Sequence, residues 1–474
     1  MILRENCKWY GSVRVMTIKL LAPLALLPDG WAKHVLIEID AHGVLLRVEP
    51  GGDGGGAREL HGPVVPGMPN LHSHAFQRAM AGLTERRGPT EDSFWTWRET
   101  MYGFVSRLTP EDIQAIATQL YVEMLEAGYT GVAEFHYLHH DPQGKPYDAI
   151  AETSERIVAA ANQAGIFLTH LPVMYTQGGF DGAPLATEQR RFANDAARFT
   201  EILDTLHKTH AKDARLRLGV ALHSLRAVSP EAMREVLVHL ESLDPAAPIH
   251  IHISEQTREV EECVEWCGRR PVQWLFENAN VNERWCLVHA THVNDEEIEM
   301  MAQSGAVVGI CPTTEANLGD GIFPAEQYAD HGGRFGIGSD SQVAVCAAEE
   351  LRLLEYGQRL TSRRRAVLAS AAQPSVGRYL YESAALGGAR AMGVEAGVLA
   401  PGARADLVIL DANAPALCGA REDEILDAAI FSATTLPVNE VLVGGRTVVA
   451  EGRHVMREEV FGRYGQTISR LRRD

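Results

Sequence analysis

The sequence has 474 residues, of which 46% are hydrophobic and 22% are charged, a composition typical of a globular protein with a large core. Acidic residues number 62 and basic residues 44, so the formal net charge is −18. This balance excludes nucleic acid and anionic membranes as general partners, and no apolar run reaches the roughly 18 residues that a membrane span needs. The 7 cysteines show no paired metal-binding spacing, so we expect reduced thiols in a cytoplasmic protein.

The two ends of the chain have a β-rich character. Residues 18–28 form an apolar run that superficially resembles a signal sequence, but Pro23 and Pro28 interrupt it, so we predict a strand. Residues 1–15 show little pattern, which leaves Met1 and Met16 as alternative starts. Hairpin-like segments within 16–61 and 396–455 carry glycines at their turns, and they predict one small composite β-sandwich built from both chain ends.

Eight short apolar runs alternate with long helical stretches in the middle of the chain. Two of these helices have clear N-terminal signals: Thr109 before 110–128, and Ser229 with Pro230 before 231–243. Most of the runs lack polar alternation, as expected of parallel strands buried on both faces. The expected strands are 62–74, 129–136, 165–175, 216–224, 249–255, 285–292, 306–315 and 334–341.

Eight strand–helix units of this length predict an α/β protein with a (β/α)8 TIM barrel. An open doubly wound sheet would more naturally carry a glycine-rich nucleotide loop after its first strand, where this chain has His-Ser-His. The expected domains are residues 65–392 for the catalytic barrel, with 1–64 and 393–474 for the two parts of the sandwich.

Polar side chains gather at the carboxyl ends of these strands, where the active sites of TIM barrels lie. His72 and His74 are two residues apart in an extended strand, so both imidazoles project to the same side. Further strand ends supply His252 with Glu255, then His289, and finally Asp340. Three histidines and one aspartate suit a borderline ion such as Zn2+ that leaves a position for water, and the metal set is His72, His74, His252 and Asp340.

This HxH, HxxE, His and Asp pattern resembles the amidohydrolase superfamily, in particular its deaminase-like branch with one metal ion. Binuclear relatives commonly carry a carboxylated lysine at the end of strand four, where this chain has His223-Ser224, so one divalent ion per chain is expected. The segments NLHSHAFQRAMAGL, DSFWTWRETMY, AEFHYLHHD, LHSLRAVSP, RWCLVHATH and TEANLGDGIFPA resemble the formimidoylglutamate deiminases of histidine degradation.

The resemblance implies a hydrolase that converts a small molecule, N-formimino-L-glutamate, to N-formyl-L-glutamate and ammonia. It implies a homodimer and assigns catalysis to Glu255, His289 and Asp340. Substrate contacts then fall on Gln77, Arg98, Tyr137, His223 and Arg226. One departure from the pattern is Gln342, where a histidine is expected.

The two arginines make chemical sense of this substrate, because Arg98 and Arg226 could each form a two-pronged contact with one of its carboxylates. The alternative within the superfamily is a deaminase acting on guanine, cytosine or a related heterocycle. A non-catalytic scaffold is disfavoured, since all four metal-ligand positions are intact.

Overall fold

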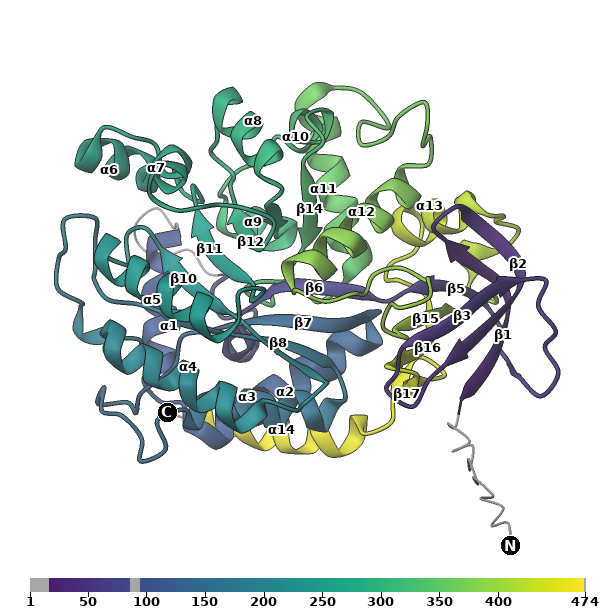
Figure 1. Ribbon diagram of the computed structural model, residues 1–474, viewed down its shortest axis with the longest axis horizontal. Coiled ribbons are helices and arrows are strands. Elements are labelled where there is room, and N and C mark those ends of the chain that lie inside the picture. The colour runs from purple at the N-terminus through teal and green to yellow at the C-terminus, as the bar shows by residue number, and fades with distance from the viewer. Residues whose placement is uncertain (1–16, 86–93, 473–474) are drawn as a thin grey trace, which may run out of the picture.

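The computed structural model describes residues 17–85 and 94–472, which form a barrel and, beside it, a separate sheet (Figure 1). The alternative starts Met1 and Met16 lie outside the described residues. Within those ranges, we find no helix whose length and apolar character would let it cross a membrane.

The eight expected runs form a nearly closed parallel barrel, which confirms the predicted fold. Neighbouring strands follow the chain order from the first to the last, and a short ninth strand, β9 (Leu216–Leu218), pairs with β8. The barrel strands are β6 (Met68–Ser73), β7 (Tyr129–His136), β8 (Phe167–Met174), β10 (Val220–Ser224), β11 (Ile249–Ile253), β12 (Trp285–His289), β13 (Val307–Ile310) and β14 (Arg334–Ile337).

The barrel closes where its last strand meets its first, a junction that we call the seam. Ser73 and Asp340 form a parallel bridge there. The Asp340 N–H donates to the His72 carbonyl at 3.0 Å, and the His74 N–H donates to the Asp340 carbonyl at 3.1 Å. Gly338 permits this approach, because a Cβ at this position would lie only 2.8 Å from the Cβ of His72. The seam therefore sets two metal-ligand candidates against the last strand.

Helices cover the outside of the barrel. The predicted caps are confirmed: Thr109 forms a capping box with Asp112, and the Ser229 side chain accepts the Ala232 N–H. The covering helices are α2 (Pro110–Glu126), α3 (Glu152–Ala164), α4 (Ala196–His210), α5 (Pro230–Leu243), α6 (Thr257–Cys267), α7 (Pro271–Asn278), α8 (Asp295–Ser304), α10 (Ala325–Asp330), α11 (Ala347–Ser362) and α12 (Val376–Ala391).

Several of the expected runs end earlier or divide, and two of them show the physical reason. The run 306–315 is strand only through Ile310, because Pro312 takes the first position of a short helix, α9 (Pro312–Leu318). The run 62–74 divides at Gly67 into β5 (Pro63–Pro66) and β6. A Cβ at Gly67 would lie 2.2 Å from the Thr130 hydroxyl, so the chain can pass close to β7 only with glycine here.

Both chain ends contribute strands to one nine-stranded sheet, which confirms the composite β-domain. Its order is β18-β17-β16-β15-β5-β1-β2-β3, with β4 paired to β1. Leu20, Ile37, Leu407 and Leu442 share one buried core although they come from opposite ends of the chain. The bounds are β1 (Ile18–Leu27), β2 (Gly30–Ile39), β3 (Leu45–Pro50), β4 (Arg58–Glu59), β15 (Leu407–Leu410), β16 (Val438–Val443), β17 (Arg446–Ala450) and β18 (Arg453–His454).

The C-terminal segment also contains helices that lie outside this sheet. These are α13 (Asp423–Phe431) and α14 (Arg457–Leu471), and α14 runs along the barrel against α2 (Figure 1). Arg470 on α14 pairs with the buried Asp112 of α2. The domain boundaries at residues 64 and 392 stay a prediction.

Candidate active site

One pocket opens at the carboxyl ends of the barrel strands, and it collects the residues that the sequence singles out. All of the predicted site residues except His72 line it. His72 lies directly beneath, fully buried, in contact with His252 and Asp340. The lining members of the predicted set are His74, Gln77, Arg98, Tyr137, His223, Arg226, His252, Glu255, His289 and Asp340.

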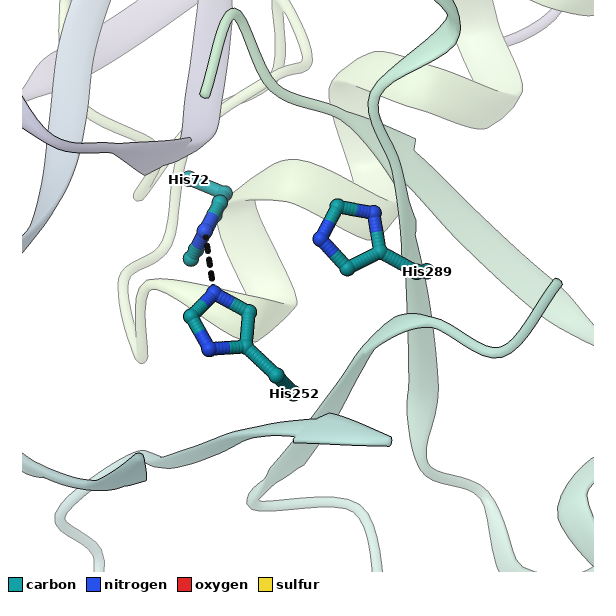
Figure 2. Close-up of side chains that lie close together, drawn as sticks. All are labelled: His72, His252 and His289. Atoms are coloured by element: carbon teal, nitrogen blue, oxygen red, sulfur yellow. Dashed lines mark hydrogen bonds between the residues drawn. The ribbon is translucent and has the colours of Figure 1, made fainter. Parts of the chain in front are cut away.

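The histidines of the predicted metal set converge at short distances. The Nε2 atoms of His72 and His252 are 3.0 Å apart, and Figure 2 shows these two rings and His289 turned toward one another. Asp340 Oδ1 lies 3.5 Å from His72 Nε2 and 3.3 Å from His74 Nε2. These atoms come from three strand ends, so the barrel itself brings the four candidates together.

Backbone carbonyls fix the orientation of two of these rings. His74 Nδ1 donates to the Phe135 carbonyl at 3.0 Å, and His252 Nδ1 donates to the His223 carbonyl at 2.9 Å. In their neutral forms, the rings of His74 and His252 therefore carry no proton on Nε2, and the lone pair of this atom faces the cluster. Burial lowers the pKa of all three histidines, that of His72 to about 3, which favours the neutral ligand form.

The charge and spacing of these side chains fit a divalent ion. Burial opposes ionisation of Asp340, but the hydrogen bond from His72 and the nearby imidazoles hold its pKa below the usual range. Ligand atoms of His72, His74 and Asp340 all lie within 4.8 Å of one another. Neutral imidazoles and an ionised carboxylate are the ligands that Zn2+ takes in catalytic sites.

A second group of carboxylates surrounds His289. Its Nδ1 lies 3.2 Å from Glu315 Oε1, and its Nε2 lies 3.7 Å from Asp340 Oδ2 and 4.0 Å from Glu255 Oε1. Burial lowers the pKa of His289, but Glu255, Glu315 and Asp340 outweigh it and raise that pKa to about 10. Burial is also the main cause that raises the pKa of Glu255 to about 7. The site therefore places an imidazole, held at Nδ1 by Glu315, beside a Glu255 carboxyl whose pKa burial raises toward neutrality.

The backbone at these strand ends is unusual. Ser254, His289, Asp340 and Gln342 all have positive φ, with values of 52°, 70°, 44° and 63°. L-residues seldom adopt this region, and such conformations gather at sites whose geometry is held by the surrounding structure.

Gln342, the departure from the family pattern, is fully buried behind the seam. Its Nε2 donates to the Ser73 hydroxyl at 3.1 Å, and its Oε1 accepts from the Ser339 hydroxyl at 2.7 Å. Ser73 in turn donates to Glu134 Oε2 at 2.7 Å. The amide thus ties the segment after β14 to Ser73, the residue between His72 and His74.

The pocket is also lined by residues that the sequence does not single out. Helix α1 (Phe94–Val105) supplies Met101 and Tyr102, and β8 and the loop after it supply Tyr175 and Phe192. Tyr175 is the last residue of the predicted strand 165–175, and this position at the carboxyl end of a barrel strand indicates a place in the active site. Phe192 follows a long irregular connection and carries no such signal.

Comparison with known proteins agrees with this geometry. Residues 64–448 match the model described as the amidohydrolase family, and residues 20–62 match the N-terminal domain of formimidoylglutamate deiminase HutF. A formimidoylglutamate deiminase of Pseudomonas aeruginosa is 53% identical over 95% of this chain and 98% of its own. A crystal structure of an amidohydrolase from Brucella melitensis has 50% identity and a TM-score of 0.91 over 96% of this chain and 99% of its own.

This chain belongs to the amidohydrolase family. A more distant relative, a 5-methylthioadenosine/S-adenosylhomocysteine deaminase of Natronomonas pharaonis, is 29% identical over 82% of this chain and 81% of its own. Within the family, the identity to the Pseudomonas protein and the matched N-terminal domain place the chain among the formimidoylglutamate deiminases.

Proposed function

We propose that the chain hydrolyses N-formimino-L-glutamate to N-formyl-L-glutamate and ammonia, as the name of its 53% identical relative suggests. The observation that carries this proposal is the pocket itself, which joins Glu255, His289 and Asp340 to Arg98 and Arg226. The amidine of such a substrate matches the group of Glu255, His289 and Asp340, and its two carboxylates match the two arginines.

We assign the metal site to His72, His74, His252 and Asp340, with one divalent ion per chain, and Zn2+ suits these ligands best. When bound, such an ion supplies Lewis acidity that makes water nucleophilic near neutral pH. The chain's own contribution here is to hold three neutral imidazoles and one carboxylate in place before any ligand arrives.

Glu255 is the proton carrier in this proposal. Its carboxyl lines the pocket beside His289, and its pKa of about 7 lets Oε1 hold a proton or release it under ordinary conditions. Glu255 can thus take the proton of the attacking water and deliver it to the nitrogen that leaves as ammonia. A general acid–base group performs best when its pKa lies near the working pH.

His289 and Asp340 orient the reacting groups. With Nδ1 directed at Glu315, the Nε2–H of His289 points toward Asp340 and the pocket, where it can donate to an oxygen or nitrogen at the reacting carbon. Asp340 keeps one carboxylate oxygen toward the ligand histidines and the other toward His289. Each group therefore acts from a fixed position.

The remaining predicted residues bind substrate in this proposal. Gln77 donates to the Tyr137 hydroxyl at 3.0 Å, and its Oε1 is a buried acceptor that has no partner among the described residues. A cationic formimino group would supply the missing N–H donor. Arg98 and Arg226 neutralise the two carboxylates, while His223 contributes its ring beside Tyr137, with centroids 5.7 Å apart.

We also propose the wider setting that the family resemblance implies. The enzyme acts in histidine degradation, in the cytoplasm, as a homodimer. Size measurement in solution by light scattering tests the dimer, and a monomer at working concentration would refute it.

The proposed reaction is tested by ammonia release from N-formimino-L-glutamate, with guanine and cytosine as competing candidates. We expect turnover of the formimino compound alone. Chelated protein should lose this activity and regain it with Zn2+, and elemental analysis should find about one ion per chain. Turnover of a heterocycle without turnover of formiminoglutamate would overturn the substrate, and two ions per chain would overturn the metal assignment.

A further inference from the structure

A single glutamine controls the hydrogen bonding of two tyrosines in the pocket wall. Gln189 is 5% exposed and lies at the end of the short 3-10 helix η2 (Thr187–Gln189). Its Oε1 accepts the Ala186 N–H at 2.9 Å. A backbone N–H can only donate, so the oxygen must occupy this end of the amide and the NH2 must occupy the other.

The NH2 end of Gln189 faces two phenols. Its Nε2 lies 2.7 Å from the Tyr175 hydroxyl and 3.3 Å from the Tyr102 hydroxyl. An amide NH2 cannot accept a hydrogen bond, so each phenol must donate its own proton elsewhere. Across residues 17–85 and 94–472, neither hydroxyl has a hydrogen-bond acceptor, and both tyrosines line the pocket.

The surrounding groups are also donors. Arg98 and Arg226 line the same pocket as Tyr175, and their charges oppose the rise in the pKa of Tyr175 that burial causes. The Arg98 guanidinium carbon is 5.7 Å from the centre of the Tyr102 ring. Arginine cannot accept hydrogen bonds, so the two phenols and the two guanidinium groups all present donors. Their chemical complement is an anionic oxygen.

We propose that Tyr175 and Tyr102 donate hydrogen bonds to the substrate carboxylates, and that Gln189 is the positioning residue that keeps both phenols as donors. This inference rests on the proposed function, which supplies the carboxylates. The positive charge of the arginines attracts any anion, whereas hydrogen bonds from the two fixed hydroxyls require the carboxylate oxygens to lie at defined positions. The wall thereby selects a carboxylate at a defined distance from the reacting amidine.

The first test is Tyr175→Phe in the metal-loaded enzyme. Losing one hydrogen bond to a charged group should raise KM for N-formimino-L-glutamate by about 10- to 100-fold while kcat changes little, because the contact is made equally in the bound and reacting states. N-formiminoglycine lacks the side-chain carboxylate, and 4-(formimidoylamino)butyrate lacks the other. The phenylalanine variant should match the wild type on whichever compound lacks the contacted carboxylate.

The second test reverses the direction of the hydrogen bonds between residue 189 and the two phenols while keeping the shape of the side chain. In Gln189→Glu, the carboxylate can still accept the Ala186 N–H but would also accept both phenol protons, so KM should rise. Gln189→Met leaves the phenols free to donate, and it should raise KM less. Tyr381→Phe is the matched control, since its buried hydroxyl donates to the Pro66 carbonyl and neither residue lines the pocket. That control should lower stability without changing KM.

The outcomes separate this inference from the proposed function. If the wild type releases no ammonia from formiminoglutamate, the proposed function fails, and the inference fails with it. If the wild type is active but Tyr175→Phe and Gln189→Glu keep the wild-type KM, only the inference is overturned. Equal losses on all three compounds would likewise overturn it, since they would indicate a structural role. Should Tyr175→Phe fail to fold, Tyr102→Phe and Gln189→Glu decide the question.

Discussion

Replacing Arg226 by alanine tests the carboxylate-binding half of the pocket. Arg226 is 9% exposed, follows β10, and lines the pocket beside His223. Its charge acts on both sides of the site, since it helps to lower the pKa of His223, where burial is the main cause, and opposes the rise in the pKa of Glu255. Removing one partner of a buried charge pair costs about 2–5 kcal/mol. At roughly 1.4 kcal/mol per tenfold, kcat/KM should fall by about 30-fold to several thousand-fold.

The assay follows ammonia release from formiminoglutamate and from its two analogues that each lack one carboxylate. The alanine variant should lose activity on every compound that keeps the contacted carboxylate and should resemble the wild type on the other. Arg226→Lys should recover only part of the loss, because an ammonium cannot reproduce the planar fork. Arg234→Ala, on the exposed face of α5, is the matched control. Equal loss on all compounds would refute the reasoning and make Arg226 a stability residue.

Three further changes probe other parts of the molecule. Glu255→Gln should keep the metal but lower kcat by about 10²–10⁴-fold, measured by ammonia release, and near-normal turnover would remove Glu255 from the mechanism. Burial raises the pKa of Glu134 from 4.5 to about 7, so the folded protein holds this proton more tightly than the unfolded chain does. Wild-type stability should therefore fall between these pH values by up to about 3 kcal/mol, and Glu134→Gln should flatten that fall in urea unfolding curves at pH 5 and pH 8. Gly338→Ala forces a Cβ against His72, so unfolding scans should show a loss of about 1–3 kcal/mol and zinc titration a weaker affinity, whereas unchanged values would mean that the strand can shift.

The barrel and its strand ends were predictable because each carries a local signal. Buried parallel strands have continuous apolar runs, and the position of His72, His252 or Asp340 at the end of such a run is visible in the sequence. The closing of both chain ends into one sheet was also predictable, since hairpin patterns occur at both ends and neither could bury its apolar face alone.

The remaining features depend on contacts between distant segments. Glu315 meets His289 only because Pro312 starts a helix where the apolar run predicts continued strand. Tyr102 lies in α1 and Gln189 lies in η2, far apart in the sequence, and nothing in the local sequence of either residue indicates that the two meet. Such pairs are set by tertiary packing, so a pattern-based prediction locates the reacting groups better than it locates the wall that selects the substrate.

The seam has a consequence for how the enzyme matures in the cell. His72 and His74 belong to the first barrel strand, and Asp340 follows the last, so the proposed ligand set spans most of the chain. A nascent chain emerges from the ribosome with its N-terminal part first, and the two histidines are therefore synthesised long before their carboxylate partner. In the proposed site, the full set of four ligands would exist only once the barrel is complete, and a bound ion would then lock the first and last strands together. The binding energy of the full proposed ligand set would therefore stabilise the finished fold.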